Sequence, residues 1–147
     1  MNGQNQHIFW ILLKLKVLKI LLILKFGLNY AIKEMADKYS NSKLNIETSF
    51  GEVRRYHQDF EIKIYNIIEE LINNILKHSK ASNATIMLVH REDNMLSIRL
   101  SDDGIGFDVK TIKNKNGLGL SHINARVKVM NGIFNIVSSG GKGTSIF

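Results

Sequence analysis

The chain of 147 residues contains no cysteine and no proline. Without cysteine there is no disulfide framework, no thiolate zinc site and no cysteine nucleophile. The absence of proline, with 11 glycines that follow no period, excludes collagen-like and proline-rich architectures. Hydrophobic residues make up 44% of the chain, which predicts one globular domain with a sizeable core. This composition is compatible with a reducing compartment, and we expect a cytoplasmic protein.

The formal net charge of +7 is unevenly distributed along the chain. Residues 1–33 carry five lysines and no acidic residue, whereas residues 34–147 are nearly balanced. No arginine-rich helix, aromatic stacking platform or other nucleic-acid-binding module accompanies the basic segment. We therefore expect no nucleic-acid partner.

The most apolar stretch of the chain is residues 8–26. Lys14, Lys16 and Lys19 interrupt it, and each central lysine costs about 2.5–3.5 kcal/mol in a membrane. The longest uninterrupted apolar run is residues 8–13, far short of the ~20 residues that a span needs. At helical spacing the lysines do not share one face, so neither a span nor an amphipathic helix is predicted.

Residues 1–26 are thus expected to be separate from a domain that covers residues 27–147. The segment has three interpretations: a helix that packs against something outside this chain, such as a partner copy; membrane contact through residues 8–26; or a segment that is not a native folding element. A secretory signal is not expected, because no basic residue precedes the apolar part and no small-residue cleavage site follows it.

From residue 27 onward, hydrophobic periodicity predicts both helices and strands. The expected helices cover residues 28–39 and 60–79 and begin again near residue 120; the expected strands cover residues 44–48, 85–89, 95–100, 133–138 and 144–147. The last strand looks truncated at Phe147.

The helix over residues 60–79 carries two adjacent faces. An apolar stripe is formed by Ile64, Ile68, Leu71, Ile72 and Ile75. A narrow arc beside this stripe holds Glu70, Asn74, Lys77 and His78. A purely solvated face would instead lie opposite the stripe. The cluster is either a surface polar group or part of a functional site.

Two glycine-containing segments add candidate ligand contacts. The strand at residues 95–100 runs into Asp102, Gly104 and Gly106; glycines allow a flat ligand to approach the backbone, and a carboxylate can accept hydrogen bonds from an exocyclic amine. An ordinary Asp/Gly turn is the alternative. Gly117 and Gly119 open the next helix, whose unpaired N–H groups suit a phosphate.

Four motifs in order resemble the ATP-binding catalytic domain of sensor histidine kinases, in the superfamily shared with gyrase, mismatch-repair ATPases and the large heat-shock chaperone. Residues 70–78 resemble the N box, 102–106 and 117–120 the two glycine boxes, and 141–144 the final glycine-threonine box. The short lid between Asp108 and Gly117 resembles the nitrate-sensor subgroup. The resemblance implies an α+β fold, a two-layer α/β sandwich in which helices cover one face of a mixed sheet.

The resemblance also implies ATP and Mg²⁺ as ligands. Asn74 would ligate Mg²⁺, and Lys77 and His78 would contact phosphate oxygens. Asp102 would bind the adenine amine with Thr144 supporting it through water. Gly104 and Gly106 would give the base room, and Gly117 and Gly119 would close the lid over the phosphates. Leu120, next to Gly119, is a further residue expected to bind the nucleotide.

The role of Glu70 stays open. In the related ATPases an acid at this position activates water, whereas in this kinase subgroup the base is an acid beside the phosphoacceptor histidine.

The implied reaction is transfer of the ATP γ-phosphoryl group to a histidine on a dimerisation domain. The implied partners are that domain and a response regulator. No histidine of this chain resembles that acceptor, so the acceptor is expected on a partner. The alternatives are an ATP-binding regulatory module without transfer, or a stand-alone anti-sigma serine kinase.

Overall fold

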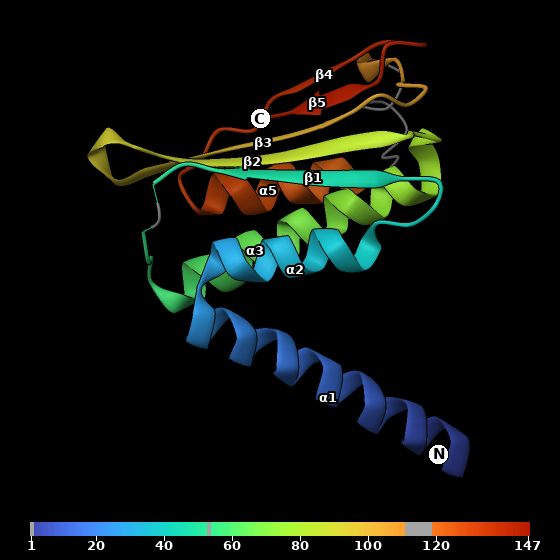
Figure 1. Cartoon of the computed structure of the whole chain (residues 1–147), viewed down its shortest axis with the longest axis vertical. Helices are drawn as coiled ribbons and strands as arrows, with labels where there is room; N and C mark the ends of the chain where they lie inside the picture. The colour runs from blue at the N-terminus through green and yellow to red at the C-terminus, as the bar shows by residue number, and fades with distance from the viewer. Residues whose placement is uncertain (1, 53, 111–118) are drawn as a thin grey trace.

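The computed structural model describes residues 2–52, 54–110 and 119–147 as a layer of helices against one face of a five-stranded sheet (Figure 1). The helices are α1 (Gly3–Phe26), α2 (Leu28–Tyr39), α3 (Gln58–Asn74), the π-helical turn η1 (Ile75–Ser79) and α5 (Leu120–Val129). The strands are β1 (Asn45–Phe50), β2 (Asn83–Arg91), β3 (Met95–Asp102), β4 (Ile136–Ser138) and β5 (Thr144–Ile146). The predicted two-layer α+β sandwich is confirmed.

The sheet is mixed, with strand order β1-β2-β3-β5-β4. Strand β1 runs parallel to β2, and the other neighbouring strands are antiparallel. The β2–β3 hairpin turns through a short helical segment, η2 (Glu92–Asn94), in which Asp93 and Asn94 adopt positive φ. Strand β5 pairs with the end of β3, so that Thr144 lies directly opposite Asp102.

The core lies between the helices and the sheet. Every second side chain in the first part of β2 points into this core. The most deeply buried side chains include Ile32, Ile68, Ile86 and Ile123. Full burial of such a side chain stabilises the fold by about 1.5–3 kcal/mol. The apolar stripe predicted on α3 is therefore the face that holds this helix on the sheet.

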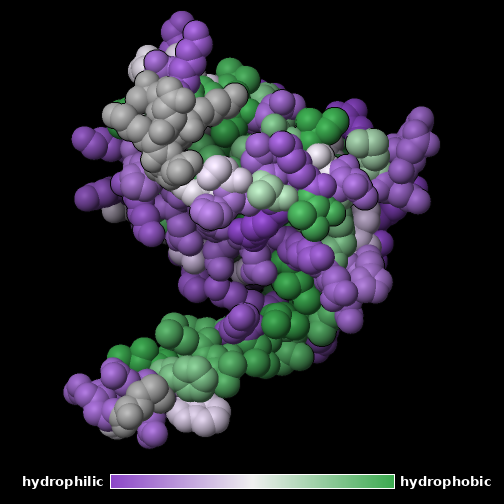
Figure 2. All heavy atoms as spheres, turned by 180° about the vertical axis from the view of Figure 1, so that it is seen from behind, coloured by the Kyte–Doolittle hydropathy of each residue, from purple (hydrophilic) through white to green (hydrophobic). Residues whose placement is uncertain are grey.

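Helix α1 extends away from the rest of the molecule (Figure 1). Ile23 is its only buried residue, and every large apolar side chain from Ile8 to Leu18 is exposed, as the apolar surface of the projecting arm in Figure 2 shows. Among the described residues, no helix combines the length and apolarity needed to cross a membrane. The division at residue 27 and the three interpretations of residues 1–26 stay predictions.

Two sets of contacts attach the C-terminal half of α1. Lys19 donates to both carboxylate oxygens of Glu69 on α3, at 2.8 and 2.9 Å. The Arg55 guanidinium donates to the main-chain oxygens of Ile23 and Leu24, and it also pairs with the fully buried Glu61 at 3.2 Å. Arg55 thereby satisfies carbonyl groups at the end of α1 and a buried carboxylate at once.

Candidate functional site

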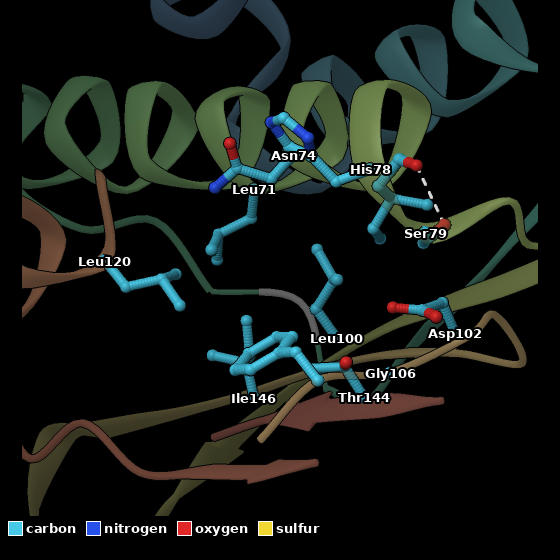
Figure 3. Close-up of a pocket in the computed structure, with 12 residues that line it drawn as sticks. Leu71, Asn74, His78, Ser79, Leu100, Asp102, Gly106, Leu120, Thr144 and Ile146 are labelled. Atoms are coloured by element: carbon cyan, nitrogen blue, oxygen red, sulfur yellow. Dashed lines mark hydrogen bonds between the residues drawn. The ribbon is translucent and has the colours of Figure 1, made fainter. Parts of the chain in front are cut away.

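A cavity lies between the end of α3 and the strands β3 and β5 (Figure 3). Its helical side holds Leu71, Asn74, Ile75, His78 and Ser79; its other sides hold Leu100, Asp102, Gly106, Phe107, Leu120, Thr144 and Ile146. The cavity therefore has a mainly apolar interior with polar groups at two opposite walls, as is typical of small-molecule sites.

The helical wall changes geometry within the site. Helix α3 ends at Asn74, and η1 continues it as a π-helical turn, where the sequence predicts one helix over residues 60–79. The Ser79 hydroxyl donates to the Ile75 carbonyl at 2.8 Å, the dashed line in Figure 3, and Lys80 ends the turn in a left-handed conformation. Such turns occur frequently at functional sites.

The polar cluster predicted on this helix is divided by the structure. Asn74 and His78 line the cavity, but Lys77 is exposed and is not among the lining residues. Glu70 is not a lining residue either; its carboxylate accepts a hydrogen bond from Arg126 of α5. A helical wheel of constant pitch places these four residues on one arc. The wider π-helical turn changes the directions of Lys77 and His78, whereas Glu70 precedes that turn and is drawn away by its bond to Arg126.

The first glycine box comes very close to neighbouring backbone. A Cβ at Gly104 would lie 2.2 Å from the Ser79 carbonyl oxygen, to which the Ile105 N–H donates at 2.7 Å. Gly106 has a φ of +64°, and a Cβ there would lie 2.1 Å from the Ser139 carbonyl oxygen. These glycines let the loop pack against η1 on one side and against the turn before β5 on the other.

Asp102 is the acidic group in the cavity wall. Burial raises the pKa of this carboxyl above its ordinary value of 3.8, while the backbone N–H groups of Gly104 and Thr144 partly oppose that shift. The Gly104 N–H donates to Asp102 Oδ1 at 2.8 Å. One carboxylate oxygen is thus held by the loop, which orients the side chain in the cavity.

Thr144 also lies in the cavity wall, opposite Asp102 on the neighbouring strand. Its hydroxyl is 2.8 Å from the Ser138 hydroxyl, and Ser138 Oγ accepts from the Phe107 N–H at 2.9 Å. Ser138 therefore links β4, β5 and the loop after the first glycine box. Ser138 was not predicted from the sequence, because a serine inside a short strand carries no signal of its position beside Thr144.

Asp103 has a different role from its neighbour. Its carboxylate accepts from the backbone N–H groups of Ser82 and Asn83 at 2.8 and 2.9 Å and from the Asn83 side-chain amide at 2.9 Å. These bonds, the Asn83 side chain first, hold the pKa of Asp103 below its ordinary value of 3.8. Asp103 therefore holds the start of β2 in place and is not one of the residues that line the cavity.

We expect Asp103→Ala to lower the melting temperature at neutral pH by several degrees, because three backbone and amide donors lose their charged acceptor. A carboxyl whose pKa is lowered by folding stabilises the folded state above the unfolded pKa, and this contribution is lost as pH falls through the folded value. The difference in melting temperature between Asp103→Ala and wild type should consequently be smaller in acid than at neutral pH. Thermal melts followed by circular dichroism at pH 7 and pH 3 measure this difference, with Asp37→Ala as the exposed control. A melting-temperature difference that is the same at both pH values would contradict the stabilising role of the Asp103 carboxylate.

The second glycine box is only partly described by the structure. Gly117 lies outside the described residues, as does most of the expected lid. Gly119 has a φ of +63° and immediately precedes α5, and Leu120 is buried in the cavity wall. The start of α5 therefore adjoins the cavity.

A family model described as "Histidine kinase-, DNA gyrase B-, and HSP90-like ATPase" matches residues 59–147. An uncharacterized sensor-like histidine kinase of Chloroflexus aurantiacus is 31% identical over 127 residues, which are 84% of this chain and 21% of that protein. The sensor histidine kinase YdfH of Bacillus subtilis is 39% identical over 97 residues, 63% of this chain and 24% of the relative.

Among solved structures, the blue-light activated histidine kinase of Erythrobacter litoralis superposes with a TM-score of 0.66 at 17% identity, over 81% of this chain and 40% of that one. At this identity the likeness shows the fold. The chain spans less than a quarter of the length of the two sequence relatives. On the family match and the sensor-kinase relatives, the chain belongs to the histidine kinase-, DNA gyrase B- and HSP90-like ATPases, as an ATP-binding catalytic domain of the sensor histidine kinase type.

Proposed function

We propose that ATP binds in the cavity with its adenine at the β3 and β5 wall and its phosphates toward α3, η1 and the start of α5. Asp102 would accept a hydrogen bond from the adenine amine, and Thr144 would support this contact through water. Leu71, Leu100 and Ile146 would cover the faces of the base. The support for this orientation is that the half-buried Asp102 carboxylate and the apolar side chains line the same cavity at the sheet.

The phosphates would contact residues on the opposite wall. His78 lies in that wall, and the exposed Lys77 on the same turn would reach phosphate oxygens outside the cavity. N–H groups at the beginning of α5, next to Gly119, would add donors to an anion, because the first turn of a helix leaves them unpaired.

Asn74 is the proposed protein ligand of Mg²⁺. Its amide belongs to the cavity wall at the phosphate side, and an amide oxygen is a hard donor of the kind that Mg²⁺ accepts. Within the described ranges no three His, Asp or Glu residues are grouped as a metal site. This fits an ion held by one or two protein oxygens, phosphate oxygens and water. When bound, Mg²⁺ would neutralise charge on the phosphates.

The proposed reaction is transfer of the γ-phosphoryl group to a histidine imidazole on a dimerisation domain, which then passes it to a response regulator. The catalytic domain would act by positioning the γ-phosphate and by neutralising its charge, since phosphoryl transfer needs little covalent participation from the protein. The observation that carries the proposal is the placement of Asp102 and Thr144 across one cavity from Asn74 and His78 (Figure 3).

Asn74→Ala should reduce the ATP affinity measured with Mg²⁺ by about tenfold or more, and should change the affinity without Mg²⁺ much less. The reason is that the variant removes a metal ligand but leaves the adenine contacts in place. Calorimetric titration with ATP in magnesium and in EDTA measures both affinities, with Asn73→Ala on the same helix as the control.

Absence of ATP binding by folded wild-type protein would contradict the proposed function. An equal loss in magnesium and in EDTA would contradict only the metal-binding role of Asn74.

A further inference from the structure

An ion pair joins the two helices that border the phosphate side of the cavity. Arg126 Nη1 on α5 donates to Glu70 Oε2 on α3 at 2.6 Å, a short, charge-assisted hydrogen bond. The two residues are 56 positions apart in sequence, so the contact is made entirely by tertiary structure. Both side chains are partly exposed, at 38% and 42%, so the energy of the pair is moderated by solvent.

The other carboxylate oxygen of Glu70 faces the residue that precedes α5. A Cβ placed on Gly119 would lie 3.1 Å from Glu70 Oε1. Gly119 is followed directly by Leu120, which is buried in the cavity wall. Glu70 is therefore hydrogen-bonded to the second turn of α5 and lies near Gly119, the residue before its first turn.

The direction of the Glu70 carboxylate bears on its chemistry. Glu70 is absent from the cavity lining, one oxygen is bonded to Arg126 and the other is beside Gly119. A general base must lie within hydrogen-bond reach of the proton that it removes. In this arrangement both oxygens are directed toward α5.

We propose that Glu70 and Arg126 are positioning residues: their ion pair holds the start of α5 against α3, and thereby places Gly119 and Leu120 at the phosphate end of the cavity. This inference rests on the proposed ATP site and deepens it, because it assigns an organising role to Glu70 and adds a residue, Arg126, that touches no part of the cavity. Pre-organised donors lower the ordering that binding must otherwise supply.

The test combines the ligand-free protein with ATP binding. In Glu70→Ala and Arg126→Ala, amide hydrogen exchange at the start of α5 should be at least several-fold faster than in wild type. The Kd for ATP with Mg²⁺ should rise by about three- to tenfold in each variant. The double variant should be no worse than either single one, because both substitutions remove the same contact.

Two further variants distinguish an ion pair from a loss of packing. Charge exchange in Glu70→Arg with Arg126→Glu should restore much of the exchange protection and of the ATP affinity, whereas either change alone should not. Lys128→Ala on the same exposed part of α5 is the control and should match wild type.

Unchanged exchange at α5 in Glu70→Ala and Arg126→Ala, or strictly additive losses in the double variant, would overturn the positioning role. That result would be obtained in ligand-free protein and does not depend on nucleotide. If the exchange results hold but wild type binds no ATP, the proposed ATP site is wrong while the contact between α3 and α5 stands.

Discussion

Asp102→Ala is expected to weaken ATP binding by about 10- to 100-fold and to abolish the preference for ATP over GTP. A hydrogen bond to a charged acceptor contributes about 1.5–3 kcal/mol, which corresponds to this range of Kd. The carboxylate can accept from the adenine amine, but against the guanine carbonyl two acceptors would oppose each other. Calorimetry or competition with ATP and GTP measures both quantities.

Asp102→Asn sharpens this test. An amide offers both an acceptor and a donor, so this variant should keep part of the ATP affinity and gain affinity for GTP relative to wild type. Asp103→Asn is the matched control, because Asp103 is bonded to Ser82 and Asn83 and should leave the ATP/GTP ratio unchanged. An Asp102→Ala variant that retained the wild-type ratio would show that the base is recognised elsewhere.

The raised pKa of Asp102 adds a pH dependence with a definite sign. Burial favours the protonated carboxyl, so the acceptor is lost at a higher pH than the ordinary value of 3.8 would give. ATP affinity in wild type should therefore fall on the acid side as Asp102 takes up a proton. The corresponding step should be missing in Asp102→Asn, whose side chain does not titrate.

The second large effect is expected in phosphotransfer: the isolated chain should not label itself, and label should appear only on a histidine-bearing dimerisation domain added in trans. In-line transfer needs the acceptor nitrogen about 3–3.5 Å from phosphorus. His78 is proposed to use its ring nitrogen on phosphate oxygens, and the His90 ring is bonded to the Tyr56 hydroxyl. His57 is the N-cap residue of α3, where its ring accepts from the Asp59 N–H, and His122 is exposed on α5.

Incubation with γ-labelled ATP, with and without the acceptor domain, measures this difference. Transfer in trans should be slow, because no covalent link raises the local acceptor concentration. Asn74→Ala is the control that should remove the signal on the acceptor. Acid-labile, base-stable label on the isolated chain would identify an acceptor histidine within it; acid-stable label on a partner serine would favour the anti-sigma kinase alternative.

Much of the fold could be predicted from the sequence, because its helices and strands follow from the local periodicity of hydrophobic residues. The alternation in β2 and β3 and the stripe on α3 depend on which side chains face the core, and these patterns repeat at the strand and helix periods. The strands expected at residues 85–89 and 95–100 correspond to β2 and β3, and the structure adds the left-handed Asp93 and Asn94 in the turn between them. The pitch change after Asn74 was not predictable, since a π-helical turn leaves no distinct spacing in one sequence.

For the site, the sequence by itself determined which segments meet at the cavity: the end of α3, the first glycine box, the start of α5 and Thr144. Only the tertiary structure decided which side chain of each segment faces the cavity. Asp102 and Asp103 are chemically alike, and their roles differ because a strand alternates its side chains and Asp103 finds the N–H groups of Ser82 and Asn83. Likewise, Glu70 shares a helical face with Asn74 but is directed to Arg126, a partner 56 residues away that no local pattern can reveal.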